Sequence, residues 1–350
     1  MTEWMPSRAF AARHENLLPL AGHPAVDMPP HVVEAAARAA RRPAYAPIQG
    51  DPSLREAIAA LHATTAECVL VTVGGMQALW LVGQVYGARA VCHSPSFFFP
   101  QVVRATGGSC DVAYDWNEYA ARVRDRATLA IVNTPVNPTG YVFRAPDLDA
   151  IAAAVEGSDA LLVSDEAYFG FVYDGLEHLS PASHPALRER TLVLRSFSKT
   201  YAMAAWRVGY AVGPRAVVEQ LACAFGWQAL AVDAVAQAAA LAALTGPQEW
   251  IESARAELGD ARAQAVDAAN ASGVLRAAMP EGAAFLWAEL DGGEEEWSDR
   301  LAREHGVTAL PGRHFHARTP HLRIPFGGRR EARQELLERL AGAGTGARGA

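Results

Sequence analysis

Lys199 is the only lysine in this chain of 350 residues, and it is the first residue whose type suggests chemistry. Lysine and arginine together number 31, so the other 30 basic side chains are arginines. A GC-rich genome that encodes surface charge with arginine accounts for the missing lysines, but not for the one that is kept. Schiff-base chemistry needs a primary amine that can lose its proton, which a guanidinium cannot do. We therefore take Lys199 as the candidate catalytic residue.

The residues around Lys199 suit a phosphate. The apolar run 191–197 leads into Ser196-Phe197-Ser198-Lys199, and Arg207 follows eight residues after the lysine. One amine, two hydroxyls and one guanidinium then lie near one point. Hydroxyl and guanidinium groups are common phosphate ligands, so this segment predicts a site for a phosphorylated molecule that reacts with an amine.

The elements that position these residues alternate along the chain up to about residue 245. We expect strands at 68–73, 90–93, 130–133, 160–165, 191–197 and 208–212, and helices at 52–62, 76–85, 145–155 and 214–225. Short apolar strands separated by helices predict an α/β fold with a mainly parallel sheet covered on both faces. The stretch 221–244 is mostly alanine, with interrupting polar residues, so we expect a buried helix there and not a membrane span.

Ligands of open α/β sheets bind beyond the carboxyl ends of the strands. There the chain has Gly74-Gly75 before a helix, Asn137 in a turn, and Asp165 at the end of a strand. Alone, each also has a plain structural interpretation: a packing turn, an Asn-Pro turn and a helix N-cap. Together with Lys199 and Arg207 they supply what pyridoxal phosphate needs: an amine for the imine, a carboxylate for the ring nitrogen, and a phosphate cradle.

On these residues the sequence resembles fold type I pyridoxal-phosphate enzymes, and among them the class I/II aminotransferases, or aspartate aminotransferase superfamily. The strongest motifs are Ser196-Phe197-Ser198-Lys199 with Arg207-Val208-Gly209, Asn137-Pro138-Thr139-Gly140 and Asp165-Glu166-Ala167-Tyr168. Weaker motifs follow in the same order as in the family, at 45–50, 71–75, 95–97, 311–312 and 321–324. The resemblance spans nearly the whole chain. It implies a large domain with a mainly parallel, seven-stranded type of sheet flanked by helices, plus a smaller α+β domain.

The resemblance also implies a role for each matching residue. Lys199 would carry the Schiff base and move the substrate proton, and Asp165 would pair with the ring nitrogen. Asn137 and Tyr168 would bind the ring hydroxyl oxygen. Phe97 would stack on the ring, and the phosphate would be held by Gly74, Gly75, Met76, Ser196, Ser198 and Arg207, with Tyr45 from the second subunit of a homodimer with shared active sites. Arg323 would bind the substrate carboxylate; we expect the arginines other than Arg207 and Arg323 to be surface charge.

The substrate side of the pocket departs from the family pattern. Met76 has no hydroxyl where many relatives have one, so only its backbone N–H could serve the phosphate. Gly22-His23-Pro24 is an unusual version of the loop that lines the substrate pocket together with Asn137. His23 has two interpretations, a pocket acid/base or a plain loop side chain. His314 and His316 lack a third ligand, so we predict no metal site.

Charge and cysteine content exclude several classes of protein. Asp and Glu number 38 against 31 basic residues, so we expect neither nucleic acid nor an anionic membrane as a partner. The four cysteines show no CxxC spacing, and the N-terminus lacks a basic start followed by an apolar run. We therefore expect a cytoplasmic protein.

The pattern of elements changes after residues 245–247. We expect helices at 248–270, 294–305 and 330–340, with strands at 283–290, 307–309 and 321–324. We divide the chain into an N-terminal segment, 1–30, that contributes to the small domain and the substrate pocket, a large cofactor-binding domain, 31–246, and a small C-terminal domain, 247–350.

These observations predict a pyridoxal 5'-phosphate-dependent amino-acid aminotransferase of amino-acid metabolism and biosynthesis, with an L-amino acid and a 2-oxo acid as its small-molecule partners. Elimination, cyclisation, decarboxylation and oxidation begin from the same imine. The alternative is therefore a lyase, cyclase or oxidase acting on an amino acid, including an arginine-derived one, in specialised metabolism. A regulator that joins this fold to a DNA-binding module is disfavoured by the acidic charge and by a fold that begins within the first few dozen residues.

Overall fold

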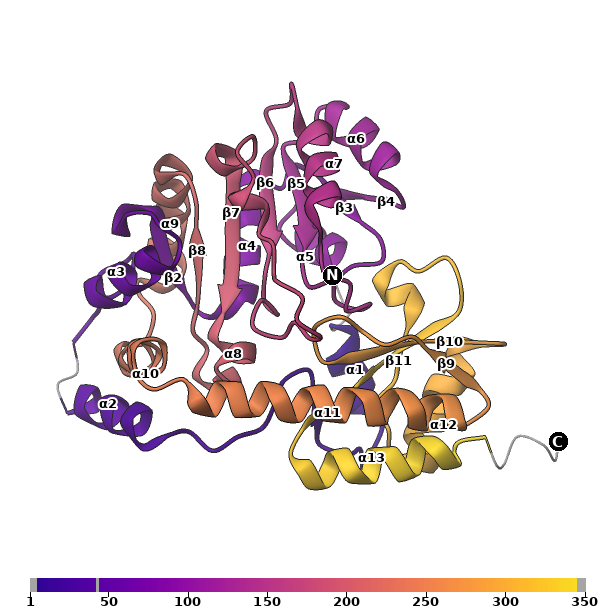
Figure 1. Ribbon diagram of the computed structural model, residues 1–350. Coiled ribbons are helices and arrows are strands. Elements are labelled where there is room, and N and C mark those ends of the chain that lie inside the picture. Colours follow the sequence, from indigo (N-terminus) through magenta and orange to yellow (C-terminus); the bar gives the residue numbers. More distant parts are fainter. Residues whose placement is uncertain (1–4, 42–43, 345–350) are drawn as a thin grey trace.

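The computed structural model describes residues 5–41 and 44–344 (Figure 1). Its largest feature is a sheet of seven strands in the order β2-β8-β7-β6-β5-β3-β4. The strands are β2 (Val69–Thr72), β3 (Arg89–His93), β4 (Ser109–Ala113), β5 (Leu129–Asn133), β6 (Leu161–Asp165), β7 (Thr191–Ser196) and β8 (Gly209–Val212). Neighbouring strands are parallel, except that β8 is antiparallel to both β2 and β7. The predicted α/β fold with a mainly parallel sheet is confirmed.

Helices cover both faces of this sheet (Figure 1). They are α3 (Pro52–Leu61), α4 (Gly74–Tyr86), α5 (Phe99–Ala105), α6 (Trp116–Arg124), α7 (Ala145–Val155) and α9 (Arg215–Ala229). α8 (Phe197–Thr200) follows the end of β7, and α2 (Pro30–Ala40) packs against α10 (Ala234–Thr245). In β5, Leu129 and Ile131 belong to a hydrophobic cluster with α4, α5 and α9, whereas Ala130 and Val132 belong to another with α6 and α7. Successive side chains of a strand point to opposite faces, so both faces must be apolar.

The expected single helix over 221–244 is wrong, because the chain bends between two helices. α9 ends at Ala229, and Leu230 has a φ of 60°. α10 begins after Asp233, whose carboxylate accepts a hydrogen bond of 2.8 Å from the Ala236 N–H. Asp233, which appears in the sequence as an interruption of an apolar helix, is the N-cap of the second one.

Four strands, at 20–21, 109–113, 275–277 and 327–328, are not among those expected from the sequence, and a fifth lies at a different position. β4 is an edge strand in which Ser109 and Asp111 are exposed and Cys110 and Ala113 are buried, so it has no continuous apolar run to reveal it. The strand expected at 307–309 lies instead at β11 (Leu310–Pro311).

The C-terminal part has its own antiparallel sheet, in the order β11-β12-β10-β9. Its other strands are β9 (Leu275–Ala277), β10 (Phe285–Leu290) and β12 (His321–Pro325), and its helices are α11 (Glu249–Ala271), α12 (Glu294–His305) and α13 (Arg330–Gly342). α11 runs from beside α10 toward this sheet, and α13 packs along α11 (Figure 1). Short 3-10 helices complete the fold at η1 (Ala66–Cys68), η2 (Pro181–Ser183), η3 (Arg188–Arg190), η4 (Ala204–Trp206) and η5 (Gly312–Phe315).

The N-terminal segment lies against the C-terminal part. β1 (Leu20–Ala21) pairs with β13 (Gly327–Gly328), and Phe10 of α1 (Pro6–Arg13) packs in a cluster with Leu310 and Phe315. Among the described residues, none of the helices combines the length and apolarity that crossing a bilayer requires.

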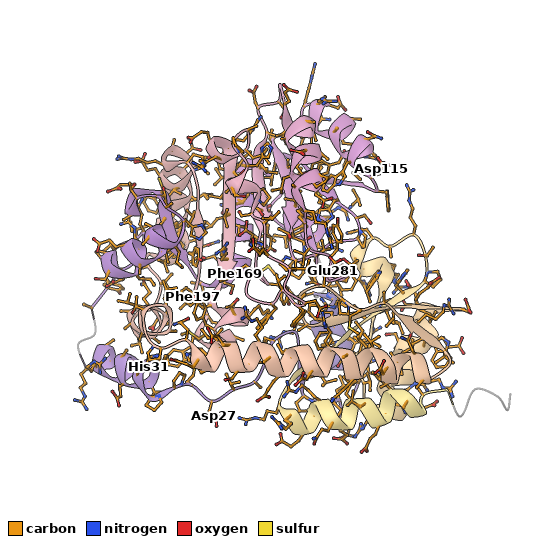
Figure 2. The ribbon with its side chains drawn as sticks, viewed as in Figure 1. Asp27, His31, Asp115, Phe169, Phe197 and Glu281 are labelled. Carbon is orange, nitrogen blue, oxygen red and sulfur yellow. The ribbon has the colours of Figure 1, made fainter. Side chains whose placement is uncertain are left out.

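An ion pair joins the two sheets. Arg144, just before α7, donates to Glu281, just before β10, with an Nη2–Oε1 distance of 2.6 Å. Figure 2 shows Glu281 at the junction, on the side where Phe169 and Phe197 follow the strand ends of the large sheet. The carboxyl ends of the parallel strands therefore open toward the C-terminal part.

Candidate active site

Lys199 lies in α8, directly after β7, at the carboxyl end of the large sheet (Figure 1). Burial lowers the pKa of its amine to about 8; the charges of Arg323 and Arg207 act in the same direction, and Asp165 acts against them. An amine with this pKa loses its proton more readily than a surface lysine and is a better nucleophile near neutral pH. The structure thus brings together the four charged residues that the sequence singled out.

Asp165 ends β6 and faces the same region. Burial raises the pKa of its carboxyl to about 6, while the Ala167 N–H, which donates to Oδ1 at 3.0 Å, and the charge of Lys199 lower it. Tyr168 lies three residues on, in the turn after β6, with its ring centre 5.8 Å from Lys199 Nζ. Burial raises the pKa of Tyr168, so its hydroxyl keeps its proton and can donate a hydrogen bond.

The residues of the predicted phosphate cradle lie together at the N-terminus of α4. Arg207 Nη1 donates to Ser198 Oγ at 3.2 Å, and Ser196 Oγ accepts from the Ser198 N–H at 3.1 Å. Gly74 has a φ of 71°, and a Cβ there would lie 2.5 Å from Arg207 Nη2. A Cβ on Gly75 would lie 3.6 Å from that of Ser196. Helix N–H groups, two hydroxyls and a guanidinium therefore converge, as an anion site requires.

Arg323 is buried on β12, between the rings of Phe285 and Phe315, at 4.2 and 4.6 Å from their centres. Its Nη1 donates to Asn137 Oδ1 at 2.9 Å. Its Nε is buried and has no hydrogen-bond partner among the described residues. Burial lowers the pKa of this guanidinium to about 10. A buried cation with an unpaired donor is costly unless an anion completes it, and a carboxylate matches its two-pronged geometry.

The remaining predicted cofactor residues occupy three different environments. Phe97 is partly exposed, whereas its neighbours Phe98 and Phe99 are core residues. Met76 packs its side chain against the large core cluster, which leaves only its backbone for a ligand. Tyr45 is 89% exposed, so within one chain it takes no part in the buried site.

Gly22 and His23 lie beside the pocket. A Cβ on Gly22 would come within 2.9 Å of the Tyr168 hydroxyl and closer still to the Phe285 ring. The Gly328 N–H donates to the His23 carbonyl at 2.8 Å, and His23 Nδ1 lies 2.7 Å from the Pro24 carbonyl. Burial and the charge of Lys199 lower the pKa of His23.

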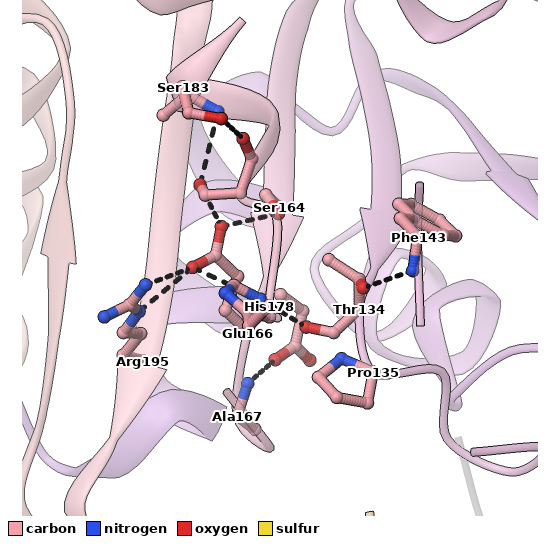
Figure 3. A network of polar contacts seen from close by, with 12 residues as sticks. Thr134, Pro135, Phe143, Ser164, Glu166, Ala167, His178, Ser183 and Arg195 are labelled. Carbon is pink, nitrogen blue, oxygen red and sulfur yellow. Dashed lines mark hydrogen bonds and ion pairs between the residues drawn. The ribbon is translucent and has the colours of Figure 1, made fainter. Parts of the chain in front are cut away.

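Sequence reasoning missed a buried network around Glu166, the residue that follows Asp165 in the chain (Figure 3). Arg195, expected as surface charge, has a side chain only 13% exposed and binds the fully buried Glu166. Arg262 and Arg333 are buried as well as Arg323, whereas Arg207 is exposed in the single chain, so the expectation that only Arg207 and Arg323 leave the surface is wrong. The signal was available: Arg195 interrupts the apolar strand β7 of a sheet covered on both faces, and a charge there must be paired.

The side chains fit pyridoxal phosphate. Gly74 leaves space that a Cβ would fill against Arg207, Lys199 has a depressed pKa, and Arg323 has an unpaired buried donor. No group of three or more His, Cys, Asp or Glu side chains is placed to hold a metal ion in residues 5–41 and 44–344.

Comparisons with known proteins agree with this geometry. The sequence model of the family "Aminotransferase class I and II" matches residues 17–340. The aspartate/prephenate aminotransferase of Thermus thermophilus is 34% identical, over 92% of this chain and 89% of that protein. The methionine aminotransferase of Escherichia coli is 30% identical, over 95% and 93%. The solved Thermus thermophilus aspartate aminotransferase with maleate superposes with a TM-score of 0.88 at 32% identity, covering 97% of each chain.

The names of these relatives favour amino transfer over elimination, cyclisation or oxidation as the reaction. The geometry is consistent with these names, because the buried lysine and the predicted phosphate-binding residues lie together at the strand ends. The chain belongs to the class I and II aminotransferases, which are pyridoxal 5'-phosphate-dependent transferases.

Proposed function

We propose that the protein moves an amino group from an L-amino acid to a 2-oxo acid, with Lys199 as the residue that binds the cofactor and handles the substrate proton. The observation that carries this proposal is the buried amine of Lys199, whose pKa of about 8 is set by burial and by Arg323, Arg207 and Asp165. Pyridoxal 5'-phosphate, when bound, supplies the carbonyl that takes up the amino group and a ring that withdraws electrons.

The residues around Lys199 divide the work of holding the cofactor. Asp165 would pair with the ring nitrogen, since a buried carboxylate at a strand end favours a cationic partner. Tyr168 and Asn137 supply hydrogen-bonding groups for the ring oxygen, and Phe97 supplies a partly exposed ring. The phosphate would be bound by Gly74, Gly75, Met76, Ser196, Ser198 and Arg207, through backbone N–H groups at the first three positions.

Arg323 orients the substrate. Its unpaired Nε and its Nη groups would bind the α-carboxylate, and its hydrogen bond to Asn137 ties that carboxylate to the cofactor side of the site. Phe285 and Phe315 flank the guanidinium and keep water from it. The amine of Lys199 can then take the Cα proton and return it, because its pKa is close to neutral.

His23 and Gly22 would line the substrate side chain. A carbonyl oxygen can only accept, so the 2.7 Å contact with Pro24 fixes the hydrogen of the neutral imidazole on Nδ1. Nε2 is then an acceptor, and the lowered pKa of His23 keeps it so. An acceptor at this position favours a substrate side chain that donates a hydrogen bond, and disfavours a carboxylate.

The protein acts, in this proposal, as a homodimer with shared sites. Large apolar side chains are exposed on one side: Tyr45 (89%), Ile48 (44%), Trp227 (92%) and Leu230 (60%). Ile48 lies against Gly226 of α9, which puts the two segments side by side. An open recess of about 450 Å³, lined by Arg207 and Asp233, brings the phosphate cradle to the surface. A second copy that covers this patch could place its Tyr45 at the recess.

Two further expectations belong to the same proposal. The division at residues 30 and 246 is supported by the separate sheets of the large and C-terminal parts. A cytoplasmic location is supported by four cysteines that are all free thiols.

The test is to load the purified protein with pyridoxal 5'-phosphate and add each amino acid in turn. The expected result is loss of the visible cofactor band with stoichiometric release of the 2-oxo acid, and recovery of the band when a second 2-oxo acid is added. Lys199→Ala is the control and should show neither change. Release of ammonia, carbon dioxide or peroxide in place of the 2-oxo acid would contradict the proposal.

A further inference from the structure

Glu166 is a fully buried carboxylate that directly follows Asp165. Arg195 Nε and Nη2 donate to its Oε2 at 3.0 and 2.8 Å. The hydroxyl of Ser164 donates to Oε1 at 3.1 Å, and the hydroxyl of Ser180 donates to the same oxygen. Burial raises the pKa of Glu166, but the charge of Arg195 and these hydrogen bonds outweigh it, so the carboxylate is ionised.

Glu166 ties the strand end that bears Asp165 to the one that bears Lys199. Its own N–H donates to the Leu194 carbonyl of β7 at 2.8 Å. Its carboxylate binds the guanidinium of Arg195, four residues before Lys199. Backbone and side chain of one residue therefore fix β6 against β7 at their carboxyl ends.

A third strand end is joined through His178 (Figure 3). His178 Nε2 lies 3.8 Å from Glu166 Oε2 and 3.1 Å from the Thr134 carbonyl, which can only accept, so Nε2 carries the hydrogen. The Thr134 N–H donates to the Asp165 carbonyl at 3.1 Å. Thr134 opens the turn after β5 that leads to Asn137.

The remaining surroundings of the Glu166–Arg195 pair are aromatic. Arg195 lies 4.1 Å from the centre of the Phe169 ring. Tyr210 of β8 faces Arg195, and its hydroxyl lies 3.3 Å from His62 Nε2. Burial raises the pKa of Tyr210 to about 12 and lowers that of His62 to about 4, so both are neutral near pH 7. Burial also lowers the pKa of His178. Glu166 is therefore the anion that neutralises Arg195.

We propose that Glu166 is a positioning residue for amino transfer: from the strand ends that it joins, it neutralises the buried charge of Arg195 and so keeps the charge balance beside Asp165 and Lys199. This inference rests on the roles proposed for Asp165 and Lys199. A purely structural clamp would stabilise the fold without affecting the charge at the cofactor, so the two roles predict different outcomes.

The test is a pH titration of the visible absorption band of the bound cofactor, whose midpoint reports the proton on the nitrogen at Lys199. Glu166→Gln keeps the size of the side chain and leaves Arg195 as an unpaired buried cation. We expect its midpoint to fall by about half a unit to one unit, because an added positive charge favours loss of the proton. Arg195→Met makes the opposite change, and its midpoint should rise.

The double variant Glu166→Gln/Arg195→Met removes both charges, and its midpoint should lie within about 0.2 unit of the wild type. Glu257→Gln is the matched control. It removes the carboxylate on α11 that pairs with the buried Arg333 on α13, and it should leave the midpoint unchanged. Circular dichroism and melting curves identify the folded variants. If one single variant does not fold, the other still tests the direction in which the midpoint shifts.

Folded single variants that titrate at the wild-type pH, or that shift in the same direction, overturn the positioning proposal while the proposed function stands. A wild-type protein that shows no cofactor band overturns both. Opposite shifts that cancel in the double variant support the inference.

Discussion

Arg323 of β12 donates a hydrogen bond of 2.9 Å to Asn137, which lies 186 positions away in the turn after β5. One bond thus joins the proposed carboxylate-binding residue of the C-terminal sheet to a proposed cofactor residue of the large sheet. The Nε of the same guanidinium has no partner among the described residues. An anion bound at the junction between the two sheets would therefore supply the missing partner of the Arg323 guanidinium.

Arg323→Lys should weaken substrate binding and leave the cofactor in place. A lysine keeps the charge but loses the fork that matches a carboxylate. Loss of one charge-assisted hydrogen bond costs about 1.5–3 kcal/mol, so kcat/KM for the amino acid should fall roughly 10- to 150-fold. Stopped-flow absorbance of the half-reaction measures this. An equal loss of cofactor affinity in the variant would contradict the assignment of Arg323 to substrate.

Lys199→Met should stabilise the cofactor-free protein at pH 7 more than at pH 10.5. Burial lowers the pKa of Lys199 from its ordinary 10.5 to about 8, so the folded chain carries a costly charge below pH 8. Between about pH 8 and 10.5 the unfolded chain binds the extra proton, so this residue's contribution to stability improves as pH rises. Urea unfolding of both proteins at the two pH values gives the difference between their free energies of unfolding. The contributions of the other titrating groups cancel in this difference. A difference that is the same at both pH values would show that the amine is not buried as a cation.

Gly74→Ala should impair the phosphate cradle. The new Cβ would lie 2.5 Å from Arg207 Nη2, and the φ of 71° suits glycine. We expect the cofactor dissociation constant to rise at least about tenfold, which corresponds to 1.4 kcal/mol. Gly157→Ala is the matched control, since Gly157 has the same φ of 71° and nothing within 4 Å of a Cβ. Equilibrium dialysis should separate the two variants, and equal effects would mean that backbone strain alone is responsible.

Trp227→Glu should prevent dimerisation. Trp227 is 92% exposed in the single chain, and a charge at the centre of an apolar interface is costly. Sedimentation velocity should show a shift from dimer to monomer, accompanied by weaker cofactor binding if Tyr45 of the second subunit completes the site. Met279→Glu, at an exposed methionine of the C-terminal part, is the control. A wild-type protein that sediments as a monomer would contradict the proposal of active sites shared between two subunits.

His23→Phe should change substrate preference and spare the reaction itself. Loss of the Nε2 acceptor removes one hydrogen bond, worth about 1 kcal/mol, so the preference for donor-bearing side chains over apolar ones should fall roughly fivefold. The ratio of kcat/KM for a matched pair, such as tyrosine and phenylalanine, measures this. An unchanged ratio would return His23 to the role of a plain loop side chain.

The sequence by itself determined the chemistry and the strands that present it. A single lysine among 30 arginines, an Asp at the end of an apolar strand and a glycine pair before a helix are local signals, because residue type and short-range periodicity carry them. The mainly parallel sheet followed from the same periodicity. Local patterns failed at the edge strand β4, where only alternate residues are buried, and at 230–233, where one cap divides two helices.

Only the tertiary structure decided which charges are buried and which distant groups meet. Arg195 interrupts an apolar run in the sequence, but only the pairing of β6 with β7 brings Glu166 to it as a partner. The bond between Arg323 and Asn137 depends on how two sheets dock, which no local pattern encodes. Burial then sets the pKa of Lys199 and Asp165, because desolvation depends on everything packed around a group and not on its neighbours along the chain.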